Sequence, residues 1–276
     1  VRAPQPSVYP ASSSHLEPPP QACLPSGQPS AWHGHLPDIA EAETTAFATV
    51  ANAARPQAVH GSRIADDLFF VALDDRTGLL RVHGDVVGSV LAGALLAELA
   101  VGEWIEVIGD LVKPSGEALR QRTVPGDALA HKVLDTVLGQ RDPLPSREWI
   151  AFLAAMAERE VADRLARANL IAVQRRRRGL SKGFVYRPAE ANLAAWPRAR
   201  LSEHCRARRE LDSHDIVLAG LCHASGLLHH VLDAAPPGTY EQAMQQVCTR
   251  LAESASVVAL LDAVESTVTA DAFKLA

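Results

Sequence analysis

Residues 86–101, Val-Val-Gly-Ser-Val-Leu-Ala-Gly-Ala-Leu-Leu-Ala-Glu-Leu-Ala-Val, form the longest apolar stretch of the chain. Ala and Leu are strong helix formers, so the stretch predicts a helix that is buried on most sides. Gly88 and Gly93 carry no side chain and would allow neighbouring elements to approach closely. Ser89 and Glu98 interrupt the stretch, which falls short of a bilayer span. We therefore expect the central helix of a globular core and no transmembrane span.

Composition around this helix indicates one mainly helical domain. The chain has 276 residues, of which 47% are hydrophobic and only 5% aromatic, and this balance favours helices over sheets. Residues 1–60 are rich in Pro, Ser, Ala, Gln and His and show no apolar periodicity, which predicts a disordered tail. We expect order to begin at Ser62, as the N-cap of a first helix, and a single domain over residues 62–276.

Apolar periodicity places further elements on both sides of the central helix. A helix is expected over 62–73, followed by a turn at 74–78 and a short strand at 79–83. A strand is expected over 104–111, with a turn at 114–116. Further helices are expected from 127 to 138, from 149, over 156–170, and over 201–210, 215–232, 240–255 and 256–268. The fold class is mainly α, with two or three small β-hairpins.

Charge is distributed unevenly along the chain. The net charge is −5, yet residues 159–209 hold fourteen of the 27 Lys and Arg residues and only four Asp or Glu. Residues 175–187, Arg-Arg-Arg-Arg-Gly-Leu-Ser-Lys-Gly-Phe-Val-Tyr-Arg, form the densest part and predict a β-hairpin. On the preceding helix Arg159, Asp163, Arg164 and Arg167 are expected to point outward. Cations beside apolar residues are typical of a surface that binds anions.

Patterns that would indicate an enzyme or a metal site are weak. The chain has no Gly-x-Ser-x-Gly elbow, no His-Glu-x-x-His pair and no glycine-rich phosphate loop. Its four cysteines show no framework spacing and are expected to be reduced thiols. His223 and Ser225 lie close together after Cys222, but a packed core position is the stronger interpretation. We predict no catalytic residue, no metal ligand and no cofactor.

The basic segment has two candidate partners. An anionic membrane attracts Lys and Arg side chains, each contributing about 1 kcal/mol, and apolar neighbours could insert. Nucleic-acid phosphate would satisfy the same cations, with Phe184 or Tyr186 stacking on bases. A pI near 6.1 argues against wholesale nucleic-acid binding. A protein adaptor that uses the same arginines is the remaining alternative.

Several runs resemble the Golgi phosphoprotein 3 family, especially its actinobacterial members. They are residues 67–78, residues 90–100, Gly126-Asp127, Trp149-Ile150, Arg164-Leu165-Ala166 and His223-Ala224-Ser225, in the family's order. The resemblance covers residues 62–276. It implies a monomeric helical domain at the cytoplasmic membrane surface that binds phosphatidylinositol 4-phosphate and can recruit a protein. It also implies a hairpin with apolar residues that enter the bilayer.

The resemblance also suggests site residues. Arg159 matches a phosphate-binding arginine of the family, whereas the family's tryptophan falls at His83 and two more of its arginines at Ala92 and Ala162. The resemblance therefore implies affinity for anionic lipid in general more than for the 4-phosphate. The predicted lipid-binding residues are His83, Arg159, Arg175, Arg176, Arg177, Arg178, Lys182 and Arg187. The predicted membrane-inserting residues are Leu180, Phe184 and Val185.

Overall fold

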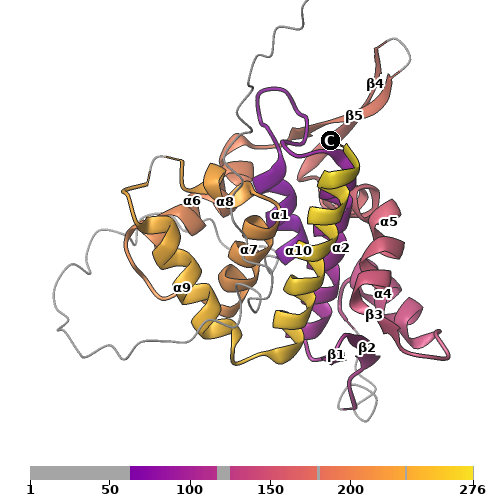
Figure 1. Cartoon of the computed structure of the whole chain (residues 1–276). Coiled ribbons are helices and arrows are strands. Elements are labelled where there is room, and N and C mark those ends of the chain that lie inside the picture. Colours follow the sequence, from indigo (N-terminus) through magenta and orange to yellow (C-terminus); the bar gives the residue numbers. More distant parts are fainter. Residues whose placement is uncertain (1–62, 117–124, 179–180, 234, 276) are drawn as a thin grey trace, which may run out of the picture.

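Helix α2 (Gly84–Val101) lies among the other helices of the fold (Figure 1). The computed structural model describes residues 63–116, 125–178, 181–233 and 235–275. The predicted tail, residues 1–60, and the predicted N-cap Ser62 lie outside these ranges. Within them the chain is mainly helical with small antiparallel strand pairs, so the predicted fold class is confirmed.

The predicted burial of α2 is confirmed, because every apolar side chain from Val86 to Leu99 is buried. It packs along α5 (Ser146–Arg167) and α10 (Ala255–Leu275). A Cβ at Gly88 would lie 2.6 Å from the Ala154 carbonyl oxygen, and a Cβ at Gly93 would collide with Val264. Among the described helices, α2 alone is long and apolar enough to cross a membrane, but 72% of its apolar window is buried, as in the core helix of a soluble domain.

The elements on either side of α2 differ in part from the prediction. Helix α1 (Ile64–Ala72) is confirmed, but residues 79–83 form no strand beyond a single bridge between Leu73 and Leu80. The strand predicted over 104–111 is a hairpin of β1 (Ile105–Ile108) and β2 (Leu111–Pro114), and β3 (Leu144–Pro145) extends it. The chain reverses between the two strands at Gly109, whose φ of 68° favours glycine. The turn predicted at 114–116 borders residues outside the described part.

Helix α4 (Ala128–Leu138) follows the prediction, whereas α5 corrects it. Two helices were expected after Pro145, yet Ser146–Arg167 is one continuous helix of 22 residues. The residues that follow Leu153 are alanine, methionine and glutamate, which favour helix and contain no breaker. Ser146 does not cap the helix with its side chain, and its hydroxyl donates to the Asp110 carbonyl oxygen (3.0 Å).

The C-terminal half consists of helices α6 (Ala191–Arg206), α7 (Ser213–Ala224), α8 (Leu227–Val231), α9 (Thr239–Leu251) and α10. Helix α6 begins ten residues before the predicted start and continues through Pro197. The helix predicted over 215–232 is broken at Gly226, whose φ is 74°. A positive φ ends an α-helix, and glycine adopts it without strain.

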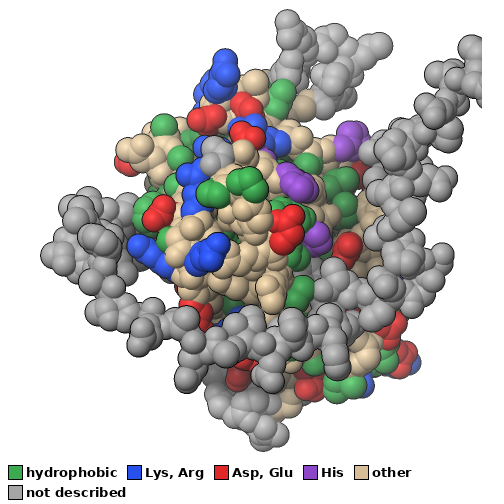
Figure 2. All heavy atoms as spheres, turned by 60° about the vertical axis from the view of Figure 1, so that its left-hand side comes forward, with side chains coloured by type: hydrophobic (Ala, Val, Ile, Leu, Met, Phe, Trp, Pro, Cys, Tyr) green, Lys and Arg blue, Asp and Glu red, His purple; other side chains and the backbone are tan. Residues whose placement is uncertain are grey.

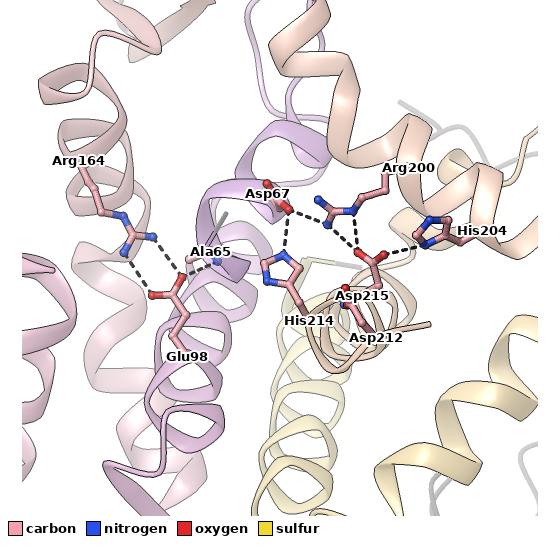
Figure 3. A network of polar contacts seen from close by, with 9 residues as sticks. All are labelled: Ala65, Asp67, Glu98, Arg164, Arg200, His204, Asp212, His214 and Asp215. Carbon is pink, nitrogen blue, oxygen red and sulfur yellow. Dashed lines mark hydrogen bonds and ion pairs between the residues drawn. The ribbon is translucent and has the colours of Figure 1, made fainter. Parts of the chain in front are cut away.

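Arg164 does not point outward as predicted, because it lies at the centre of a buried ion cluster. Figure 3 shows its contact with Glu98. Its side chain is 5% exposed and donates to Asp66 Oδ1 (2.8 Å), Glu98 Oε2 (3.2 Å) and Asp127 Oδ2 (3.0 Å). Asp127 is also the N-cap of α4, accepting the Ala130 N–H. The three carboxylates come from α1, α2 and the start of α4, so Arg164 ties three segments to α5. The arginine pattern of α5 alone could not reveal these distant partners.

A second cluster joins the other side of α1 to α6 and α7 (Figure 3). Arg200 donates to Asp67 Oδ2 (2.9 Å) and to Asp215 Oδ1 (2.6 Å). His204 Nδ1 lies 3.0 Å from Asp215 Oδ2, and His214 Nε2 lies 2.9 Å from Asp67 Oδ2. Adjacent aspartates of one short helix therefore fasten α1 to the segments on both sides of it.

We expect the Asp66 carboxyl to make stability depend on pH. Burial raises its pKa to about 6 in spite of the Arg164 guanidinium, since Glu98 opposes ionisation as well. A raised carboxyl pKa means that the folded state binds the proton more tightly, so stability increases as the pH falls through about 6. Between pH 7.5 and pH 5 the free energy of unfolding of the wild type should increase by about 1 kcal/mol relative to Asp66→Asn. Urea unfolding at both pH values measures this difference, and parallel pH profiles of the two proteins would contradict it.

Candidate functional site

The hairpin predicted around residues 175–187 is present and extends away from the helices (Figure 1). It consists of β4 (Ile171–Arg178) and β5 (Ser181–Pro188), so it begins four residues before the predicted segment. The register pairs Arg175 with Phe184, then 176 with 183, 177 with 182 and 178 with 181. These last four pairs contain five cationic residues and no acidic residue. The side chains of Arg176, Arg177, Arg178 and Lys182 lie outside the described part.

The root of the hairpin is fastened to the helical body through Tyr186. This side chain is 1% exposed, its ring packs edge-to-face on Phe69, and its hydroxyl donates to Glu158 Oε1 (2.6 Å). Burial and the Glu158 carboxylate raise the pKa of Tyr186, which keeps the hydroxyl protonated as a donor. The backbone N–H of Tyr186 donates to the Gly78 carbonyl oxygen (2.8 Å). A Cβ at Gly78 would lie 2.6 Å from Val185 Cγ1, so the loop after α1 requires glycine there.

Arg159 lies at this root and already has partners. Its Nε donates to both carboxylate oxygens of Asp163 (2.9 Å each), and this hydrogen bonding raises its pKa. Its guanidinium carbon lies 5.0 Å from the centre of the Phe184 ring. The side chain remains 51% exposed, so Arg159 is accessible while part of its charge is compensated.

The predicted inserting residues do not lie together at the end of the hairpin. Leu180 lies outside the described residues. Phe184 is half-buried and stacks on Tyr186. It pairs with Arg175, three residue pairs before the last described pair of the hairpin, 178 with 181. Val185 contacts the loop at Gly78. Insertion of these two side chains would require the helical body itself to approach the acyl chains.

The other predicted positions are divided between the surface and the core. Arg175 and Arg187 are exposed on the hairpin. His83 is exposed as the N-cap of α2, with Nδ1 3.7 Å from Asp85 Oδ2. Ala92 and Ala162 are 0% exposed, so neither position faces a surface on which an arginine would meet a ligand.

A cavity of about 890 Å³ lies at the hairpin root, between α2, α5, β5 and α10. Small side chains of α5 and α10 and the ring of Phe184 line its apolar part. Its charged lining consists of the arginines Arg147 and Arg159 and the acids Asp85, Glu148, Glu158 and Asp271. Sequence reasoning missed the cavity, because these residues come from segments far apart in the chain. In the sequence, only the family resemblance at Arg159 and at His83 pointed to this part of the molecule.

The polar residues of α7 have structural partners. Ser225 is buried and donates to the Leu221 and Cys222 carbonyl oxygens (2.8 and 3.2 Å). His223 Nδ1 lies 2.6 Å from the Tyr240 hydroxyl, and burial lowers the pKa of His223. The Cys222 side chain is fully buried, which raises the pKa of its thiol. Ser225 and Cys222 are therefore packed in the core, as the stronger sequence interpretation expected.

Residues 64–270 match the model of the family Golgi phosphoprotein 3 (GPP34). The chain belongs to the Golgi phosphoprotein 3 family. The match covers most of the range, 62–276, over which the sequence resembles that family. It also includes the whole hairpin and every described residue that lines the cavity except Asp271. No curated protein matches the chain.

Proposed function

We propose that this protein is a non-enzymatic peripheral membrane-binding domain that docks on anionic phospholipid through the β4–β5 hairpin. The observation that carries the proposal is the concentration of five cations and no acid in the last four residue pairs of a projecting hairpin. Each Lys or Arg near an anionic leaflet contributes about 1 kcal/mol, so this group is sufficient for reversible docking. Membership of the Golgi phosphoprotein 3 family supports a lipid partner.

Charge elsewhere on the body supports the hairpin as the docking element. On the face shown in Figure 2, Lys and Arg side chains lie among Asp and Glu side chains. Interspersed charges of both signs produce no extended positive field. We therefore propose the hairpin, and not this face, as the element that docks on an anionic surface. We propose that a tail of residues 1–60 precedes a monomeric domain of residues 62–276 at the cytoplasmic membrane surface, where the domain additionally recruits a protein.

The family resemblance favours phosphatidylinositol 4-phosphate as the lipid. We propose that this lipid is bound here through its negative charge. The cavity at the hairpin root has more carboxylates than guanidiniums in its lining, which disfavours a phosphomonoester inside it. We expect vesicles with phosphatidylinositol 4-phosphate and vesicles with phosphatidylglycerol to bind equally when their surface charge is matched. A strong preference for the phosphoinositide at matched charge would contradict this part of the proposal.

Removal of hairpin cations tests the proposal directly. The triple variant Arg175→Ser, Arg176→Ser, Arg177→Ser should lose roughly 100-fold in affinity for phosphatidylglycerol vesicles, because about 3 kcal/mol of attraction is removed. Vesicle sedimentation at several salt concentrations measures the effect, and the salt dependence should become shallower in the variant.

A matched control removes the same charge elsewhere in the arginine-rich region. Arg206→Ser, Arg208→Ser, Arg209→Ser changes three exposed arginines at and after the end of α6 and should change the affinity less than threefold. Undiminished vesicle binding by the hairpin variant would refute the assignment. Loss of binding to single-stranded nucleic acid, with vesicle binding retained, would favour the nucleic-acid alternative.

A further inference from the structure

The described arginines of the hairpin strands have no counterion in the helical body. Residues 171–188 contain six Lys or Arg and no Asp or Glu. Arg175 and Arg187 are exposed, and neither forms an ion pair within the described part of the chain. The other run of arginines, 206–209, has acidic residues on both sides of it in the sequence. The body therefore leaves Arg175 and Arg187 free to bind an anion.

The outer edge of β4 adds backbone donors to these cations. The Tyr186 N–H donates to the Gly78 carbonyl oxygen and so points away from β4. Two residues paired across an antiparallel sheet direct their backbone groups either both inward or both outward. Val173 pairs with Tyr186, so its N–H and C=O point away from β5, as do those of residues 175 and 177 by alternation. No described strand pairs with this edge, which therefore offers N–H groups to a ligand.

The opposite charge occurs in the sequence that precedes the described domain. Residues 3–54 contain no Lys or Arg, and three of their four acids lie within six residues, at Asp38, Glu41 and Glu43. Carboxylates pair with guanidinium groups and accept hydrogen bonds from backbone N–H groups. These are the two kinds of group along β4, so residues 38–43, the acidic segment, are complementary to its edge.

The chain between the acidic segment and the domain is long enough for this contact. The Ala65 N–H donates to Glu98 Oε1 (2.8 Å), so the domain begins beside the last turn of α2. The hairpin root lies at the first turn of α2, about 20 Å away at 1.5 Å per helical residue. The strands extend about 17 Å beyond Tyr186. The 20 residues from Glu43 to Arg63 span up to about 66 Å, so the acidic segment can reach the whole hairpin.

We propose that the acidic segment, residues 38–43, binds along the outer edge of β4 in the same chain and competes there with anionic phospholipid. Covalent linkage keeps the segment at a high effective concentration near the hairpin. The segment therefore inhibits docking, and a membrane displaces it where the density of anionic lipid is high. The competition rests on the proposed function, whereas the contact between segment and hairpin is independent of any membrane.

Carbodiimide coupling of the full-length chain without vesicles tests the contact itself. The reagent joins a carboxylate to an amine in contact with it, and Lys182 is the amine of the hairpin strands. Mass spectrometry of the digested monomer should find the acidic segment linked to Lys182, and not to Lys132, which is exposed on α4. The variant Arg175→Ser, Arg176→Ser, Arg177→Ser retains Lys182 and should give about fivefold less of this product.

Vesicle binding tests the competition. Full-length Asp38→Asn, Glu41→Gln, Glu43→Gln, the tail variant, should bind phosphatidylglycerol vesicles about fivefold more tightly than the wild type, because the competitor is removed. A peptide of residues 36–47 at millimolar concentration should reverse this gain, and the same peptide with the three amide substitutions should not.

A matched control separates competition from a general change in net charge. Glu103→Gln, Asp110→Asn, Asp142→Asn removes three exposed acids at the end of the molecule that carries β1 and β2. Its vesicle affinity should change less than about twofold, because these acids lie far from the hairpin compared with the screening length. Equal gains in this control and in the tail variant would overturn the competition.

The two assays also distinguish this proposal from the hairpin assignment. Vesicle binding that survives in the hairpin variant, with coupling at Lys182 still dependent on the arginines, would refute lipid docking by the hairpin and leave the contact standing. Equal coupling at Lys182 and Lys132, or coupling between two chains in place of one, would overturn the contact even where vesicle binding depends on the hairpin.

Discussion

Replacement of Arg164 by Met is expected to lower the free energy of unfolding by about 3–5 kcal/mol. The guanidinium lies between Asp66, Glu98 and Asp127, whose side chains are 14%, 10% and 14% exposed. Without it the three carboxylates would face one another with little solvent, and Arg63 would remain beside two of them, 3.6 Å from Asp127 and 4.0 Å from Asp66. Met retains most of the buried volume, so the loss reports on charge and not on a cavity. Urea unfolding at pH 7.5 measures the loss, which should become smaller towards pH 5 as the Asp66 carboxyl takes up a proton.

Arg167→Met provides the control, because this arginine is exposed in the last turn of the same helix. Its replacement should change stability by less than about 0.5 kcal/mol. Equal small losses in both variants would show that the cluster is hydrated in solution and does not hold α5 to α1 and α2.

Replacement of Asp215 by Ala is expected to cost about 3–5 kcal/mol as well, through the second cluster. The Asp215 side chain is 0% exposed and accepts hydrogen bonds from Arg200 (2.6 Å) while His204 Nδ1 lies 3.0 Å from its other oxygen. The variant would leave the Arg200 guanidinium with Asp67 alone. Chemical denaturation followed by circular dichroism measures the loss.

Asp212→Ala is the matched comparison at the start of the same helix. Asp212 caps α7 by accepting the Asp215 N–H (2.8 Å), and loss of such a cap costs about 1 kcal/mol. A cost for Asp215→Ala no greater than that for Asp212→Ala would mean that the cluster contributes nothing beyond local helix capping.

Local patterns predicted much of the fold correctly. The central helix, the closeness of neighbours at Gly88 and Gly93, and the cationic hairpin all depend on residues within a few positions of one another. Hydrophobic periodicity and turn chemistry act at that range. The errors arose where a local pattern was ambiguous. The sequence predicts two helices around Leu153 where one continuous helix lies, and it predicts one helix across Gly226, where α7 ends.

Properties that depend on distant contacts could not be predicted. The helical pattern predicts that both Arg159 and Arg164 point outward. Arg164 is nevertheless buried among three carboxylates, whereas Arg159 is half exposed. The sequence predicts that Phe184 is an apolar residue near the end of a hairpin. The register instead places it at the root, where it stacks on Tyr186. The cavity combines residues of α2, α5, β5 and α10, and no spacing in the sequence brings these segments together.

The attachment of Tyr186 to Glu158 and Phe69 has a consequence for geometry. A hairpin fastened at its root on both α5 and α1 behaves as a rigid arm, so its direction is fixed relative to the helices. A protein anchored through such an arm would adopt one tilt on a flat bilayer and would not swivel about a loose tether. The end of the molecule that carries β1 and β2 lies away from the hairpin in Figure 1 and would then always face the aqueous side.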